Sequence, residues 1–134
     1  MKKEPVYPAE DDIISLNLLA LSIIPAKKSD KAEVLSKAKI TSALDACKNF
    51  DGDIYSKAAV MLTSLVRAHA FASGNRRTAF LAAKEFLLNN GAKFSIKDDP
   101  HHSRVLLGVR EGFYSIDELK EWIQHGKIRD FKRH

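Results

Sequence analysis

The sequence predicts an all-α fold of about six or seven helices in a single domain, residues 1–134. Two stretches, Ile54–Ala68 and Thr78–Asn89, carry apolar residues at helical spacing. A short polar turn joins them, and turn or capping residues separate the other apolar stretches. The length suits one hydrophobic core. We expect the helices to surround a central helix that starts near Asn75.

The chain should open with an irregular lead over residues 1–10, which contains Pro5 and Pro8. The run Ile13–Ile24 is apolar nearly all round and follows three acidic residues. Acidic residues favour the start of a helix, so we expect a buried helix that ends at Pro25. A buried strand is the alternative for so short an apolar run.

The next helix is expected over Lys31–Asn49, with Asp30 as its N-cap. Its apolar face shifts along its length, so two shorter helices with a break near Lys37 fit the pattern equally well. The residues that follow, NFDGD, are typical of a turn.

The two central helices show the clearest pattern. Apolar residues of Ile54–Ala68 form one stripe, and His69 continues it, so this histidine should emerge from the buried side of the helix end. Many alanines line the stripe of Thr78–Asn89 and allow close helix packing. Asn90 and Gly91 are a helix stop signal.

Two helices should complete the fold. Asp99 and Pro100 are an N-cap and first-turn pair for a helix that runs to about Arg110. The stretch Ser115–Glu118 reads as a capping box, and the helix that it opens should end at Gln124.

Composition bounds the function classes. The net charge is +5, and a basic, mobile tail is expected over residues 126–134. Charge is spread along the chain, so it does not favour a nucleic-acid-binding function. The single cysteine, Cys47, excludes an internal disulfide. No apolar run is long enough for a membrane span and no signal-type leader occurs, so we expect a cytoplasmic protein without membrane contact.

The stretch between the central helices, HAFASGNRR (His69–Arg77), carries the chemistry. Backbone N–H groups at the start of a helix lack internal partners, and the helix dipole is positive there. Gly74 lets the chain approach a ligand closely, and Arg76 and Arg77 add donor forks suited to phosphate. The pattern predicts a phosphate cradle with a possible general base, His69, nearby.

These residues resemble the Fic/Doc motif H-x-F-x-[D/E]-[G/A]-N-[G/K]-R, and the continuation RTAFLAAKEFLLNNG resembles the death-on-curing (Doc) branch. The resemblance covers about Lys37 to His125. It implies a Fic/Doc-like helical bundle. The family has a short extended flap before the helix that LSKAKITSALDAC resembles, and no alternating pattern marks a strand there in this chain.

The resemblance assigns a role to each motif position. His69 matches the general base, which takes the proton of a target hydroxyl. Phe71 matches a packing residue. Gly74 and Asn75 match the residues that hold phosphate oxygens, and Arg77 matches the final arginine, which stabilises transition-state charge. In isolation, a histidine at a helix end and a Gly-Asn turn have ordinary structural readings.

Two positions differ from most family members. Arg76 stands where Fic proteins have glycine and Doc has lysine; the basic residue favours transfer of the terminal phosphate over AMP transfer. Ser73 stands where the family has the Asp or Glu that binds Mg²⁺. A hydroxyl is a poorer ligand than a carboxylate. Either nucleotide and water hold the metal, another carboxylate reaches in, or the protein is catalytically impaired.

The resemblance thus implies a Doc-like toxin that transfers a phosphoryl or nucleotidyl group from ATP or another nucleoside triphosphate, with Mg²⁺, to a Ser or Thr hydroxyl of a protein. A translation elongation factor is the expected target, and an antitoxin is an expected partner. The alternative is a catalytically impaired protein of this fold that binds a nucleotide or partner. The pairs His101–His102 and Lys27–Lys28 are read as surface residues.

Overall fold

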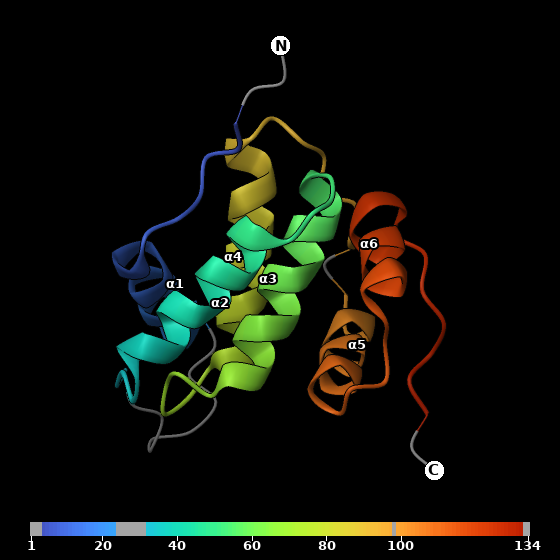
Figure 1. The fold of residues 1–134 in the computed structure, drawn as a ribbon. Helices are drawn as coiled ribbons and strands as arrows, with labels where there is room; N and C mark the ends of the chain where they lie inside the picture. The colour runs from blue at the N-terminus through green and yellow to red at the C-terminus, as the bar shows by residue number, and fades with distance from the viewer. Residues whose placement is uncertain (1–3, 24–31, 98, 133–134) are drawn as a thin grey trace.

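The computed structural model describes residues 4–23, 32–97 and 99–132. Within these ranges it is all-helical, as expected, with the six helices named in Figure 1. Their bounds are α1 (Glu10–Ile23), α2 (Lys37–Asn49), α3 (Ile54–Ala68), α4 (Asn75–Asn89), α5 (His101–Arg110) and α6 (Ile116–His125). None of the helices in the described ranges is long and apolar enough to cross a membrane.

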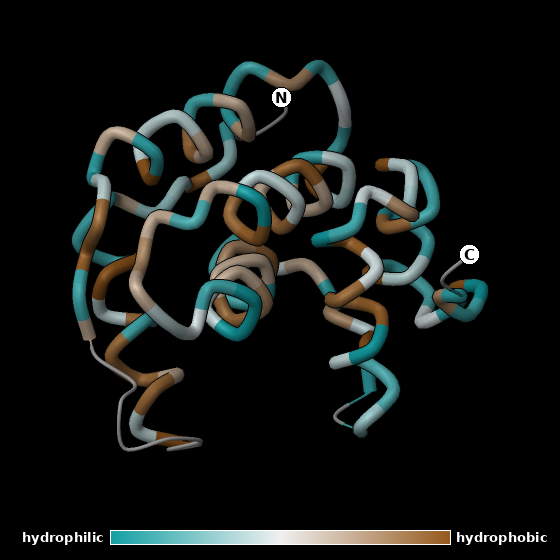
Figure 2. Tube along the Cα trace, turned by 90° about the horizontal axis from the view of Figure 1, so that it is seen from below, coloured by the Kyte–Doolittle hydropathy of each residue, from teal (hydrophilic) through white to brown (hydrophobic). Residues whose placement is uncertain are grey.

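The helices α3 and α4 form the centre of the molecule. Helix α3 contacts α2, α4, α5 and α6, whereas α4 contacts α3 and α1. The centre is therefore this pair rather than α4 alone. Figure 1 shows α1 and α2 on one side of the pair and α5 and α6 on the other. Apolar positions gather along the central helices, and hydrophilic positions lie toward the outside (Figure 2).

The N-terminal half departs from the expected bounds. Helix α1 begins at Glu10, so the strand alternative for this run is wrong. Its expected end at Pro25, like Asp30 and Lys27–Lys28, lies outside the described residues. The next helix starts only at Lys37, where the Ser36 side chain accepts a hydrogen bond from the Lys39 N–H. Residues 32–36 are not helical, so neither one helix from Lys31 nor a pair of shorter helices with a break near Lys37 fits the described part of this stretch.

The starts of α3 and α6 follow their sequence signals, whereas the N-cap of α5 is Pro100 and not Asp99 as expected. The Asp53 carboxylate caps α3 by accepting from the Ser56 N–H at 2.8 Å, and it also pairs with Lys120 of α6 at 2.8 Å. Burial would raise the pKa of Asp53, but the hydrogen bonds from Lys120 and Ser56 more than offset it and lower the pKa. The capping box of Ser115 and Glu118 is present at the start of α6.

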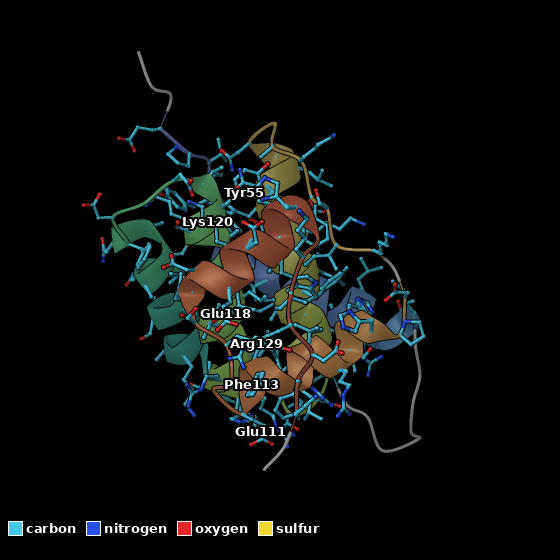
Figure 3. All side chains as sticks on the ribbon, turned by 90° about the vertical axis from the view of Figure 1, so that its right-hand side faces the viewer. Tyr55, Glu111, Phe113, Glu118, Lys120 and Arg129 are labelled. Atoms are coloured by element: carbon cyan, nitrogen blue, oxygen red, sulfur yellow. The ribbon has the colours of Figure 1, made fainter. Side chains whose placement is uncertain are left out.

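The tail is packed rather than mobile over residues 126–132. Phe131 is buried, and its ring lies 5.1 Å from that of Phe113. Arg129 pairs with Glu118 and donates to the Phe113 carbonyl at 2.8 Å (Figure 3). Gly108 makes room for this arrangement, since a Cβ there would lie 3.1 Å from the Phe131 ring. The expectation of a mobile tail failed because it weighed the basic residues and overlooked Phe131.

Replacing Phe131 with alanine should lower the free energy of unfolding by about 1.5–3 kcal/mol, the value of burying a large apolar side chain. Urea denaturation followed by circular dichroism would measure the change. Lys132→Ala is the matched control, because Lys132 is the exposed neighbour on the same tail. Equal stability of the two variants would show that the tail is not docked.

Candidate functional site

The loop between α3 and α4 turns sharply at both ends. His69 ends α3 with φ of 51°, the only positive φ of a non-glycine residue among those described. Gly74 precedes α4 with φ of 77°. A Cβ on Gly74 would lie 3.1 Å from Leu21 and 3.3 Å from Asn17, both of α1. Glycine is required here by conformation and by space.

The Asn75 side chain closes this loop. Its Oδ1 accepts from the Phe71 N–H at 3.1 Å, and its Nδ2 donates to the Phe71 carbonyl at 2.9 Å. Phe71 itself is buried in the core, which agrees with its expected packing role. We expected the Asn75 amide to hold phosphate oxygens; in this structure it fixes the loop. The backbone N–H of Asn75 lies in the first turn of α4, where N–H groups have no acceptor within the helix and can donate to a ligand.

A short extended segment pairs with the loop. Val34 forms an antiparallel bridge with Phe71. The Leu35 N–H donates to the Ala70 carbonyl at 2.7 Å, and the Ala72 N–H donates to the Glu33 carbonyl at 2.9 Å. This segment lies where the resemblance places a flap. Its pairing partner is far away in the sequence, which is why no alternating pattern announced it.

A buried asparagine of α1 anchors the loop through hydrogen bonds. Asn17 is 2% exposed, and its Nδ2 donates to the Ser73 carbonyl at 2.9 Å and to the Thr78 hydroxyl at 3.1 Å. Both amide hydrogens are thereby used. Sequence reasoning missed this role. The available signal was the one asparagine in a largely apolar run, which predicts a buried polar group with a specific partner.

The imidazole of His69 is exposed at the end of α3 and makes no hydrogen bond with any described residue. It had been expected to emerge from the buried side of the helix. His69 has a left-handed backbone between the end of α3 and the buried residues Ala70 and Phe71, and its own side chain reaches solvent. This position suits a group that must meet a substrate hydroxyl.

The two arginines at the start of α4 have different surroundings. Arg76 is exposed. Arg77 is partly buried, and its Nη1 lies 3.4 Å from the Ala20 carbonyl near the end of α1. The first turn of α4 contains no acidic residue, so two cations lie at the positive end of a helix dipole. The arrangement can bind an anion through backbone N–H groups and guanidinium donors.

The residues of the loop do not form a metal site of their own. Among the described residues, no group of three histidine, cysteine, aspartate or glutamate side chains could hold a metal ion. The Ser73 carbonyl already accepts from Asn17. Mg²⁺ prefers hard oxygen ligands, usually carboxylates. The described residues of the loop thus offer donors that suit phosphate oxygens, and none of them is a carboxylate that could bind Mg²⁺.

The other candidate features lie outside this site. His101 contacts Asp130 at 3.1 Å, whereas the His102 ring packs edge-on against Phe80, so the two histidines serve different contacts. Trp122 and Cys47 are buried in the core, and burial raises the pKa of the Cys47 thiol to about 11. Trp122 and Cys47 are thus part of the hydrophobic core.

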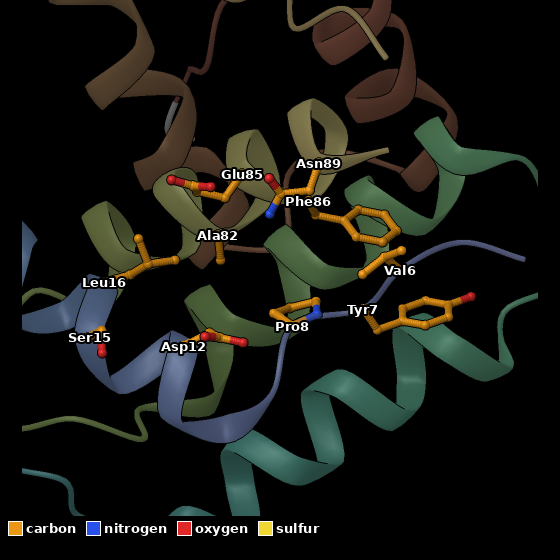
Figure 4. Close-up of a pocket in the computed structure, with 10 residues that line it drawn as sticks. All are labelled: Val6, Tyr7, Pro8, Asp12, Ser15, Leu16, Ala82, Glu85, Phe86 and Asn89. Atoms are coloured by element: carbon orange, nitrogen blue, oxygen red, sulfur yellow. The ribbon is translucent and has the colours of Figure 1, made fainter. Parts of the chain in front are cut away.

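A hollow of about 290 Å³ lies between the N-terminal lead, α1 and α4 (Figure 4). Its lining includes Asp12 from the first turn of α1 and Glu85 from the second half of α4. Helix α1 runs antiparallel to α4, because Asn17 contacts Thr78 and Leu21 lies beside Gly74. The hollow is therefore at the opposite end of this helix pair from the loop.

Comparison with known families tests the resemblance. A model of the Fic/DOC family matches residues 11–87, which is more than half of the chain. The chain belongs to the Fic/DOC family. The Fic/DOC match includes α1 and so contains Asn17 as well as the loop. We expected similarity over Lys37–His125; the match starts earlier and ends within α4, so the similarity of the last two helices stays a prediction.

A curated relative, "Toxin Doc" of Mycolicibacterium smegmatis (strain ATCC 700084 / mc(2)155), is 41% identical over 54 residues. The aligned stretch is 40% of this Fic/DOC chain and 42% of that protein. The chain thus matches less than half of the length of this relative.

Replacing Asn17 with leucine should lower the free energy of unfolding by about 1–3 kcal/mol, because the Ser73 carbonyl and the Thr78 hydroxyl lose their donor in a buried place. Urea denaturation would measure the loss. Ser15→Ala, at an exposed position of the same helix, is the control and should change stability by less than about 0.5 kcal/mol. Indistinguishable stabilities would mean that Asn17 does not hold the loop.

Proposed function

We propose that this protein is a Doc-like toxin that transfers the terminal phosphoryl group of ATP or another nucleoside triphosphate to a Ser or Thr hydroxyl of a protein. The observation that carries the proposal is the Fic/DOC loop, which places an exposed histidine beside a cationic helix start. The protein would act in the cytoplasm. A translation elongation factor is the proposed target, and an antitoxin protein the proposed partner.

The proposed reaction uses the residues at the mouth of the loop. The target hydroxyl oxygen attacks the terminal phosphorus, a new P–O bond forms, and the bond from that phosphorus to the bridging oxygen breaks. His69 takes the hydroxyl proton, and the nucleoside diphosphate leaves with the bonding electron pair. The N–H groups at the start of α4 and the guanidinium of Arg77 hold the phosphate oxygens.

Arg76 bears on which phosphorus is attacked. Arg76 stands at a position that is glycine in most Fic proteins. Its guanidinium is exposed and can bind two oxygens at once. A basic side chain there supports transfer of the terminal phosphate. Transfer of a nucleotidyl group, with attack at the α-phosphorus, is the alternative for the same loop.

A second function has a specific observation in its favour. Ser73 replaces the carboxylate of the family, and the described residues offer no metal cluster in its place. A protein of this kind could bind a nucleotide or a partner without catalysing transfer.

The test is label transfer from ATP into host-cell extract with Mg²⁺, with the label in parallel on the α- and γ-phosphates. We expect γ-label transfer by the natural protein and its loss, by about 100-fold or more, in His69→Ala. His101→Ala is the matched control, because this exposed histidine lies outside the loop.

Three other outcomes have distinct meanings. Transfer of α-label alone would contradict phosphoryl transfer and establish nucleotidyl transfer. Transfer by Ser73→Asp but not by the natural protein would show a site impaired by loss of its metal ligand. Absence of label in all folded variants would favour the binding function.

A further inference from the structure

A shallow groove of about 360 Å³ lies between α2 and α3, immediately beside the end of α3 that carries His69. Helix α2 contributes Lys39, Ser42 and Ala43, and helix α3 contributes Ser64, Arg67 and Ala68. Ala68 precedes His69 directly. Within the described ranges, the lining contains two cations, two hydroxyls and no carboxylate.

The two cations of the groove are available to a ligand. Lys39 and Arg67 are exposed, and neither side chain forms a hydrogen bond or ion pair with any residue in the described part of the chain. The guanidinium of Arg67 lies against Gly112, where a Cβ would be 3.6 Å from its Nη1.

Ordinary helix electrostatics explains only one of these cations. Arg67 lies in the last turn of α3, where the dipole favours positive charge. Lys37 and Lys39 lie in the first turn of α2, where the dipole disfavours it, and this turn has no acidic residue. The fold also places Lys39 and Arg67 in the lining of the same groove, so two like charges border one space. An anion in the groove would relieve both effects.

We propose that this groove binds an acidic segment of the protein target, with Asp or Glu carboxylates between Lys39 and Arg67, and thereby brings the target hydroxyl to His69. The inference rests on the proposed function and names the chemistry of its target. The groove is shallow and has alanines in its lining, so it fits side chains of an extended chain. Hydroxyls of Ser42 and Ser64 can donate to the same carboxylates.

A nucleic acid fits the groove less well. Binding to nucleic acid depends on several cations that follow a phosphate backbone. Among the residues that the structure describes, two cations line this groove. A carboxylate segment needs no more than the two cations and the neighbouring hydroxyls.

The first experiment measures the binding of fluorescein-labelled hexaglutamate to the full chain by fluorescence anisotropy at low salt. We expect saturable binding that weakens by about tenfold or more in the double variant K39E/R67E. The charge control is K93E, which alters an exposed lysine beyond the far end of α4. It should bind as the natural protein does, within about twofold.

Loss of peptide binding can be distinguished from misfolding of the variants. A glutamate at position 39 suits the first turn of α2 better than lysine does. Arg67→Gln removes the second charge without reversing it, and circular dichroism checks each variant. Equal hexaglutamate affinity in K39E/R67E and the natural protein would overturn the proposal. So would binding of labelled oligothymidylate, lost in K39E/R67E, without hexaglutamate binding.

The second experiment separates this inference from the proposed function. Hexaglutamate binding needs no catalysis, so His69→Ala should bind the peptide normally even though it transfers no label. If the natural protein transfers label, K39E/R67E should transfer it to protein at least about tenfold more slowly while its affinity for ATP, measured by calorimetry, is unchanged. Undiminished transfer by K39E/R67E would contradict target binding in the groove. It would not contradict the proposed phosphoryl transfer.

Discussion

The site depends on the hydrogen bonds that close the loop between α3 and α4. Asn75 binds both backbone groups of Phe71, and Asn17 binds the carbonyl of Ser73 from the neighbouring helix. These contacts hold the loop between two left-handed residues, His69 and Gly74. These hydrogen bonds fix the loop. They thereby also fix the position of the His69 imidazole relative to the first turn of α4. Helix α1, which carries no catalytic group in our account, is thereby part of the site.

The same region carries positive charge at the starts of two helices. Two helices start beside the loop, α2 and α4, and both have basic and no acidic residues in their first turns. A cation at the positive end of a helix dipole is electrostatically unfavourable, and a bound anion would offset this at each of the two helices. In the proposed function, phosphate oxygens would bind at the start of α4, and in the further inference carboxylates would bind in the groove next to α2. The lack of a protein carboxylate at Ser73 makes this end of the molecule more cationic than the family motif implies.

Sequence reasoning predicted most of what is local. Apolar spacing located the central helices, and the box at Ser115 and Glu118 marked the start of α6. It could not find what depends on contacts between distant segments. The bridge of Val34 with Phe71 and the bonds of Asn17 link residues far apart in the chain, and no periodicity encodes them. Phe131 was hidden among basic residues for the same reason, since only its packing partners reveal that it is buried.

The central claim is that the first turn of α4 binds the phosphates of a nucleotide without a carboxylate from the protein. The most direct measurement is a titration of ¹⁵N-labelled protein with ATP, in Mg²⁺ and again in EDTA, followed by amide chemical shifts. We predict that the largest shifts occur at Gly74, Asn75, Arg76 and Arg77 in both conditions. Shifts that are absent, or that gather instead on the basic tail over residues 127–132, would contradict the account.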